Sequence, residues 1–318
     1  MTERWWVGID VSKATLVIGL WQEEGGKDLW DVPNEEASFQ EVVERLRSVD
    51  PKRIVLEATG GWERGIAAAL LGAGLPAVVV NPRLVKDYRK SLNQLAKTDR
   101  IDAIVLARFG YGTLPKLRPL PEPTMVDLQG KLARRRQLVE FLSSEKNRLV
   151  TAAPDSVLEI REHIQWLQQH IAAYDDQIGQ LIEASPAWLA KASLLRSVKG
   201  IGPVISRTLI GDLPELGTVS KGQIAFLAGL APLNCDSGES EGARHIKGGR
   251  AHVRTAIFMA TRVALRHNPR LRLFYSRLLA KGKLPKVALI ATMRKLLVTL
   301  NAMLRDGTSW CDRSALEA

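Results

Sequence analysis

Cysteine is scarce in this chain, which has only Cys235 and Cys311 among its 318 residues. Two cysteines are too few for a disulfide framework or for a zinc site built on cysteine, so we expect neither. Apolar runs are broken well before the roughly 20 residues that a membrane-spanning helix needs. The N-terminus lacks a basic start followed by an apolar run, so we expect no secretion signal and a cytoplasmic protein.

Acidic residues are scarce in the C-terminal part. The whole sequence has 45 Lys and Arg against 34 Asp and Glu, a net charge of +11. From Trp188 to the end there are 21 basic and 8 acidic residues (+13), whereas the remainder holds 24 and 26 (−2). A regional excess of this size indicates a polyanion partner. No lipid anchor or juxtamembrane helix accompanies the charge, which favours nucleic acid over a membrane.

The first 113 residues alternate strand and helix patterns and are predicted to form one α/β domain. Short β-branched apolar runs predict strands, and Ser38 is predicted to cap the first helix. The order of these elements, βββαβαβα, describes a mixed sheet covered by helices, as in the RNase H-like architecture. The predicted strands are 5–9, 15–20, 29–32, 54–56 and 77–80, and the predicted helices are 38–46, 62–71 and 98–109.

Residues 114–187 are predicted to be a connector, and residues 188–318 a mainly α-helical domain. Four prolines between positions 115 and 123 mark a linker, which two long helical segments divided near Pro154 follow. The second segment has an a/d pattern over about three heptads, typical of a coiled coil. This seam can close on the preceding helix or pair with another subunit, and the sequence leaves both open. The seam residues are Ile160, Ile164, Leu167, Ile171, Tyr174, Ile178 and Leu181.

Four acidic residues lie at element boundaries of the N-terminal domain. Asp10 and Glu57 end two predicted strands, while Asp99 and Asp102 stand three apart at the start of a predicted helix. Strand ends and helix N-termini meet at one edge of such a sheet, where four carboxylates repel one another unless cations bind between them. Hard oxygen ligands favour Mg²⁺ or Mn²⁺, which suit phosphodiester chemistry. Any one of these acids alone, Asp99 in particular, is better explained as a cap or a first-turn acid than as a ligand, so the prediction rests on the set.

The segments that contain these acids resemble three motifs of the DEDD transposases, insertion-sequence enzymes related to the Piv and MooV DNA invertases. The segments read VGIDVSK at 7–13, LEATGG at 56–61 and KTDRIDA at 97–103. The resemblance implies a RuvC-like N-terminal domain in which Asp10, Glu57, Asp99 and Asp102 bind the catalytic metal. The basic residues beside Asp99, Lys97 and Arg100, are candidate nucleic-acid contacts.

A Gly-Ile-Gly-Pro sequence at 200–203 lies between two helical stretches. A hairpin of this kind exposes backbone N–H groups at a helix N-terminus, which bind phosphate without reading sequence, and it resembles a helix-hairpin-helix motif. It is equally a plain interhelical turn. The neighbouring lysine and the regional charge favour DNA, so Lys199, Gly200 and Gly202 are candidate contacts.

Basic residues also gather where a glycine-rich stretch, 229–249, joins the next predicted helix. Each contact of such a residue with a phosphate steepens the salt dependence of DNA binding. The candidate contacts at this junction are Arg244, Lys247, Arg250 and Arg254.

The glycine-rich stretch contains a Ser-Gly pair at Ser237. The residues by themselves indicate only a polar loop. The resemblance extends to this segment and implies a C-terminal transposase domain in which Ser237 is the nucleophile that attacks the scissile phosphate, with Ser240 as the nearby alternative. A serine hydroxyl needs a base or a metal to act in this way, and neither Asp236 nor His245 is an evident base. We therefore predict a composite active site in which the metal of the N-terminal domain activates Ser237.

The resemblance spans nearly the whole chain and implies a transposase or site-specific recombinase that rejoins strands through a phosphoserine link without ATP. It also implies a homodimer or homotetramer and, as in some members, a structured noncoding guide RNA (a bridge RNA). Two alternatives stay open. One is a metal-dependent nuclease, similar to Holliday-junction resolvases, that cuts by water attack. The other is a nucleic-acid-binding protein without catalysis, against which the four intact carboxylates argue.

Overall fold

The computed structural model describes residues 4–93, 98–117, 119, 122–234 and 244–311. The chain divides into two compact units, Met1–Pro121 and Glu122–Ala318. The break thus falls eight residues after the predicted boundary at 113. The segment predicted as a connector belongs to the same unit as the C-terminal helices. We describe each unit by itself.

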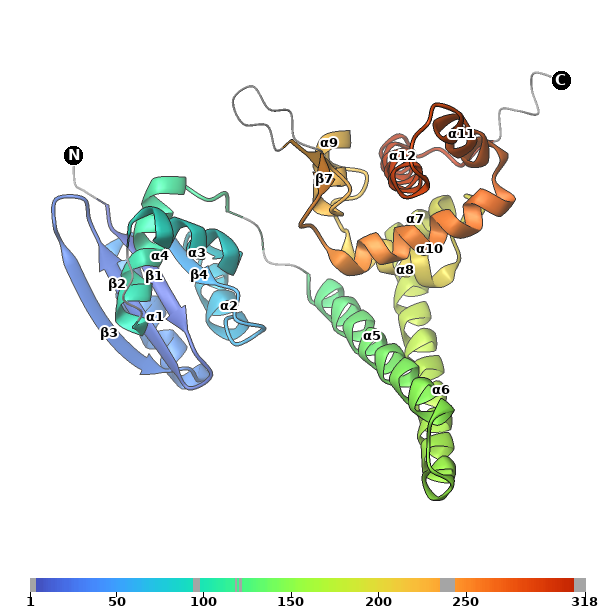
Figure 1. Ribbon diagram of the computed structural model, residues 1–318. Coiled ribbons are helices and arrows are strands. Elements are labelled where there is room, and N and C mark those ends of the chain that lie inside the picture. The colour runs from blue at the N-terminus through green and yellow to red at the C-terminus, as the bar shows by residue number, and fades with distance from the viewer. Residues whose placement is uncertain (1–3, 94–97, 118, 120–121, 235–243, 312–318) are drawn as a thin grey trace. The chain divides into compact units, whose positions relative to one another are not determined.

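The N-terminal unit is a five-stranded mixed sheet with a hydrophobic core on each face (Figure 1). The strand order is β3-β2-β1-β4-β5, with β1 antiparallel to β2 and parallel to β4. This arrangement confirms the predicted RNase H-like α/β fold. The strands are β1 (Trp6–Val11), β2 (Thr15–Trp21), β3 (Lys27–Pro33), β4 (Arg53–Glu57) and β5 (Ala77–Val80), and the helices are α1 (Glu36–Val49), α2 (Arg64–Gly72), α3 (Pro82–Ser91) and α4 (Asp99–Thr113).

Two local predictions in this unit need correction. Ser38 does not cap α1, because the helix already begins at Glu36 with Glu35 in the N-cap position. Helix α3 was absent from the predicted elements, although its start has a clear signal: the Asn81 side chain accepts a hydrogen bond from the N–H of Arg83 at 2.9 Å, and Pro82 occupies the first helical position. The first error concerns a helix end, where short polar residues offer several competing starts, and the second is a helix with a single buried residue, Val85.

Glycine at position 8 lets α4 lie directly on the central strand. A Cβ at Gly8 would collide with the carbonyl oxygen of Ala103 and lie 2.6 Å from the Cβ of Leu106. Near the other end of the helix, a Cβ at Gly110 would lie 2.9 Å from Val55 and 3.5 Å from the Trp6 ring. Helix α4 therefore runs antiparallel to β1, with its N-terminus toward the carboxyl end of the strand.

The C-terminal unit begins with a hairpin of two long helices, α5 (Pro123–Val150) and α6 (Pro154–Ala184) (Figure 1). The predicted seam packs against α5 of the same chain, with Leu167 and Ile178 fully buried. A bidentate ion pair between Arg135 on α5 and Asp175 on α6, with both N–O distances 2.8 Å, fixes the register of the hairpin.

The rest of this unit is a helical domain with one large hydrophobic core. Its elements are α7 (Pro186–Arg196), α8 (Pro203–Asp212), α9 (Lys221–Leu227), β6 (Pro232–Leu233), β7 (His245–Ile246), α10 (Ala251–His267), α11 (Pro269–Ala280) and α12 (Pro285–Asp306). Among the described residues, α12 is the one helix long and apolar enough to span a membrane. Leu296, Leu297 and Leu300 of this helix are fully buried in the core, as expected for the central helix of a globular domain.

Candidate active site

The strands β1 and β4 bring two of the predicted carboxylates to one edge of the sheet. The strands are parallel neighbours, and Ile9 lies opposite Leu56 in their register. Asp10 and Glu57 each follow this pair by one residue, so they stand side by side at the carboxyl ends of the two central strands. Both side chains are partly buried, and both interact with other groups.

The same edge receives the other two carboxylates, because α4 runs antiparallel to β1. Asp99 and Asp102 occupy the first turn of α4, which the Thr98 hydroxyl caps by accepting from the N–H of Ile101 at 3.2 Å. Asp99 is exposed, whereas Asp102 is partly buried and forms an ion pair with Arg89 of α3. Arg100, predicted to contact nucleic acid, lies 3.5 Å from Asp31 of β3 in an exposed ion pair.

The four carboxylates thus share an edge but do not form a closed metal cage. Within the described residues, no three His, Cys, Asp or Glu side chains lie close enough together to hold an ion. The chemistry of the donors suits a hard divalent cation. Asp102, however, is neutralised by Arg89, a partner that the sequence did not reveal. Binding of an ion by all four residues therefore requires rotation of side chains.

Two residues that the sequence analysis missed hold the loops beside this edge. The Asn34 side-chain amide donates to the carbonyl of Ser12 at 2.8 Å and to that of Trp62 at 3.3 Å. It thereby connects the turn after Asp10 to the loop after Glu57. The second residue is Glu63, which has only 9% of its surface exposed.

The Glu63 carboxylate organises the loop that follows Glu57. One of its oxygens accepts from the N–H of Thr59 at 3.0 Å, from the hydroxyl of the same residue at 3.0 Å and from the N–H of Gly61 at 2.8 Å. Burial by itself raises the pKa of Glu63, but these hydrogen bonds and one from its own N–H outweigh burial, so the pKa lies below its usual 4.5. The only sequence signal was an acid six residues after Glu57, behind a Gly-Gly pair.

We expect Glu63→Gln to lower the free energy of unfolding by about 1–3 kcal/mol at pH 7, because an amide replaces part of a buried acceptor site with donors. Since the folded-state pKa is lowered, the carboxylate stabilises the fold above about pH 4.5 and loses this effect as the pH falls through the folded-state value. Urea unfolding at several pH values should therefore show the variant approaching wild type in acid. Glu44→Gln, at an exposed position on α1, is the matched control and should change stability by less than about 0.5 kcal/mol. An equal effect of both changes would contradict this role for Glu63.

The predicted nucleophile Ser237 lies outside the described residues, as do Ser240 and Lys97. The flanks of the serine-containing segment are described: β6 and β7 pair antiparallel, with Leu233 opposite His245. At the base of this segment Gly229 and Gly249 pack backbone to backbone, since a Cβ on Gly249 would lie 2.5 Å from the Cα of Gly229. The two ends of the segment are therefore held together by a short sheet and a glycine contact.

The predicted DNA contacts around this base differ in their surroundings. Arg244 and Lys247 are exposed. Arg254 is partly buried and donates to the carbonyl of Gly248 at 2.8 Å. Arg250 makes a bidentate ion pair with Glu215, with two 2.6 Å hydrogen bonds, and also donates to the carbonyl of Asp212 at 3.1 Å. Its guanidinium therefore has a structural role that the sequence analysis did not foresee.

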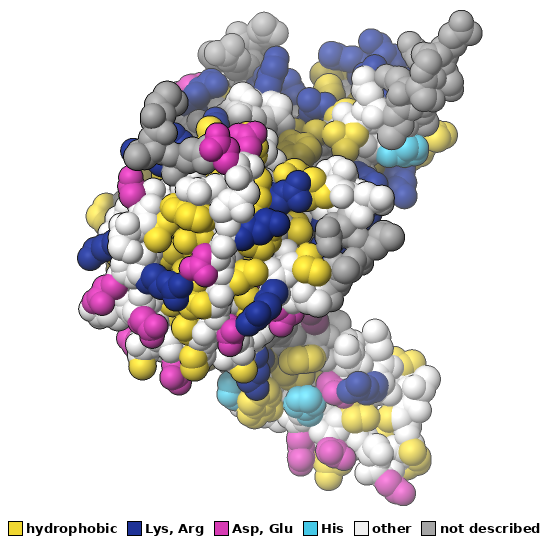
Figure 2. All heavy atoms as spheres, turned by 90° about the vertical axis from the view of Figure 1, so that its left-hand side faces the viewer, with side chains coloured by type: hydrophobic (Ala, Val, Ile, Leu, Met, Phe, Trp, Pro, Cys, Tyr) yellow, Lys and Arg dark blue, Asp and Glu magenta, His cyan; other side chains and the backbone are white. Residues whose placement is uncertain are grey.

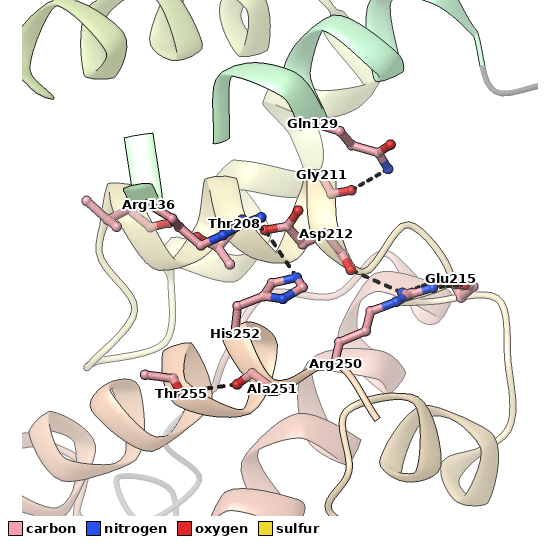
Figure 3. A network of polar contacts seen from close by, with 11 residues as sticks. Gln129, Arg136, Thr208, Gly211, Asp212, Glu215, Arg250, Ala251, His252 and Thr255 are labelled. Atoms are coloured by element: carbon pink, nitrogen blue, oxygen red, sulfur yellow. Dashed lines mark hydrogen bonds and ion pairs between the residues drawn. The ribbon is translucent and has the colours of Figure 1, made fainter. Parts of the chain in front are cut away.

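Figure 3 shows that this role belongs to a larger network around the end of α8. The Asp212 carboxylate forms an ion pair with Arg136 of α5 and lies 3.6 Å from Nε2 of His252 on α10. Burial raises the pKa of Asp212 despite these cations, and burial lowers the pKa of His252 despite the carboxylate. With Gln129 of α5 donating to the carbonyl of Gly211 at 2.9 Å, the network fastens the hairpin to the helical domain. This explains why the predicted connector is not a separate unit.

The predicted Gly-Ile-Gly hairpin lies between α7 and α8. Gly200 has a φ of +109° and packs on α10, because a Cβ there would lie 2.8 Å from the carbonyl oxygen of Ala260. Gly202 is the N-cap of α8 and has no such neighbour, while Lys199 is exposed. Close packing therefore explains the glycine at position 200, whereas at position 202 a Cβ would meet no neighbour within 4 Å.

Comparisons with known proteins extend over most of the chain. A DEDD family model described as a transposase matches residues 7–154, and a model described as the transposase IS116/IS110/IS902 family matches residues 192–276. The pilin gene-inverting protein of Moraxella bovis is 30% identical over 317 residues, which cover 95% of this chain and 96% of that protein. This chain belongs to the IS110/IS116/IS902 family of transposases. The transposase for insertion sequence element IS1111A of Coxiella burnetii is 23% identical over 297 residues, covering 82% of this chain and 78% of that protein.

A solved structure of Thermus thermophilus RuvC aligns with 36% of this transposase and 98% of its own chain, at 21% identity and a TM-score of 0.26. Membership of the family makes the chain an enzyme that acts on DNA. The DEDD fold generally uses divalent metal ions. The predicted carboxylates Asp10, Glu57, Asp99 and Asp102 all fall within the matched segment 7–154, and Ser237 falls within 192–276.

Proposed function

We propose that this IS110-family transposase cuts and rejoins DNA by transesterification, with Ser237 as the nucleophile and four carboxylates as the metal site. The main observation in support is that Asp10, Glu57, Asp99 and Asp102 reach one edge of the sheet from three separate elements. A structural role for each acid does not explain why all four collect there.

In the proposed reaction the Ser237 hydroxyl oxygen forms a bond to the scissile phosphorus, and the bond from phosphorus to the bridging oxygen of the departing strand breaks. The serine proton passes to solvent, and the departing oxygen takes up a proton from solvent. The phosphoserine link keeps the ester bond energy, so attack by another strand end restores the DNA and regenerates serine without ATP. The exposed cations Arg244 and Lys247 would bind the phosphate backbone of the DNA.

We propose Mg²⁺ or Mn²⁺ as the cofactor, held by the four carboxylates. A bound divalent ion polarises the phosphate and lowers the pKa of an attacking hydroxyl. Asn34 and Glu63 act indirectly, by positioning the turn after Asp10 and the loop after Glu57.

We also propose that the transposase is guided by a bridge RNA, that it assembles as a homodimer or homotetramer, and that it acts on genomic DNA in the cytoplasm. These rest on the family resemblance and on the net positive charge of the C-terminal part.

A second candidate function is metal-dependent DNA cutting by water, without a covalent link. This function is favoured by the position of the carboxylates, which all lie within the N-terminal unit. A nuclease site built on them needs no serine from the C-terminal unit.

We expect chelation by EDTA to stop strand cutting while leaving most of the salt-sensitive DNA binding, because the ion acts on the phosphate whereas Lys and Arg supply the affinity. Cutting and binding are measured on the same labelled duplex, by denaturing gel and by fluorescence anisotropy. Added Mg²⁺ in excess of the chelator should restore cutting. Undiminished cutting in EDTA would rule out the metal site.

A further inference from the structure

Acidic residues are missing from a long part of the C-terminal unit. Residues 242–305 contain 15 Lys and Arg and no Asp or Glu, whereas the rest of the chain has 30 and 34. Figure 2 shows the contrasting situation on one face of the N-terminal unit, where acidic and basic side chains are interspersed. Like charges without acids between them repel one another, which disfavours the compact state unless a polyanion offsets the repulsion.

Six of these cations lie on α11, on the turn that follows it and at the start of α12, a surface we call the α11–α12 corner. All six residues are exposed, and none forms an ion pair with an acid of the described chain. Arg270 and Arg277 are seven residues apart and therefore share one side of α11, and Lys281 is the C-cap residue of the same helix. The corner consists of Arg270, Arg272, Arg277, Lys281, Lys283 and Lys286.

The corner is an ordered surface. Backbone hydrogen bonds close the turn, from the N–H of Lys281 to Arg277 and from that of Lys283 to Leu278, at 3.2 and 3.1 Å. Gly282 takes the left-handed conformation, with a φ of +73°, that the turn requires. On its other side α11 is anchored by Leu271, which is buried in the core.

We infer that the α11–α12 corner binds the phosphodiester backbone of duplex DNA, as a contact surface separate from the cations at the base of the serine segment. The inference rests on the proposed function, since it takes DNA as the polyanion. The corner presents exposed cations at the end of a helix, and such cations contact phosphates without reading bases. An anionic membrane is the alternative partner that the test includes, because Leu273, Leu279 and Leu284 are exposed beside these cations.

The test is a triple substitution, Arg277→Gln, Lys281→Gln and Lys283→Gln. In EDTA, which removes catalysis, the variant should bind a labelled duplex roughly 10- to 100-fold more weakly, and the slope of log K against log salt should fall by about 2 to 3. The matched control has the same charge change at exposed positions of the α5–α6 hairpin: Arg134→Gln, Lys146→Gln and Arg161→Gln. We expect little effect there. Equal thermal melting curves for all three proteins would show that folding is intact.

An unchanged affinity, or an equal loss in the control, would overturn the inference and leave the proposed cutting function standing. Duplex RNA of the same length and vesicles containing phosphatidylserine serve as the other two arms. A loss confined to RNA or to vesicles would assign the corner to that partner and overturn the DNA inference. Failure of the wild-type protein to bind DNA at all would instead refute the DNA partner itself.

Discussion

Ser237→Ala is expected to abolish recombination, with a loss of about 10³-fold or more, because it removes the oxygen that forms the phosphoester link in the proposed reaction. A denaturing gel of labelled DNA incubated with the wild-type transposase should show a fraction of DNA covalently attached to the chain. The same gel with the variant should show none. Binding of DNA by the variant should be unchanged, since removal of a hydroxyl leaves the net charge as it was.

Ser240→Ala is the control for this substitution, since it removes a hydroxyl only three residues away. We expect it to retain recombination and the covalent adduct. If Ser237→Ala cuts DNA at the wild-type rate and neither protein forms an adduct, water is the nucleophile. The second candidate function, a metal-dependent nuclease, then replaces the first.

Asp10→Asn is expected to lower strand cutting by about 10³-fold or more, the size of loss that follows removal of a group acting directly on the transition state. Asparagine has the shape of aspartate but lacks the charge that binds a divalent ion. Cutting rates as a function of Mg²⁺ or Mn²⁺ concentration measure the effect, and we expect that excess metal does not restore the wild-type rate.

The control for the metal site is Asp28→Asn, which removes an exposed acid of β3 that pairs with Arg45. It should cut DNA normally, because a surface ion pair contributes little and lies apart from the acids at the strand ends. Asp10→Asn should also bind DNA as wild type does in EDTA. Normal cutting by Asp10→Asn would exclude the carboxylate set from catalysis, whatever the outcome at Ser237.

The sequence predicted the order of strands and helices well because the N-terminal strands are short β-branched runs separated by turns. Helix α3 was not predicted because it has few apolar residues, and Val85 is its one buried residue. The a/d seam of α6 indicated a partner helix but could not identify it. In the structure the partner is α5, and the pairing of Arg135 with Asp175, 40 residues apart in sequence, fixes the register of the two helices.

The candidate site was predictable to the extent that it lies at element ends. Asp10, Glu57 and the first turn of α4 could be placed at one edge from strand and helix order alone. Arg89, Asn34 and Glu63 could not, since each acts through a contact that exists only after the sheet and loops have assembled. Arg250 has a role that the sequence did not reveal. This cation near the serine segment is predicted to contact DNA, and in the structure Glu215 and the Asp212 carbonyl bind its guanidinium.

The bare backbone of Gly8 against α4 limits how the acids can rearrange. The backbone of α4 packs directly on the backbone of β1 at Gly8, without side chains between them that could adjust to a shift of the helix. The Cα atoms of Asp99 and Asp102 therefore keep fixed positions relative to that of Asp10. Any tightening around an ion must come from torsions of the short acidic side chains themselves. The metal site that we propose would therefore be assembled by rotation of side chains on a frame that stays constant.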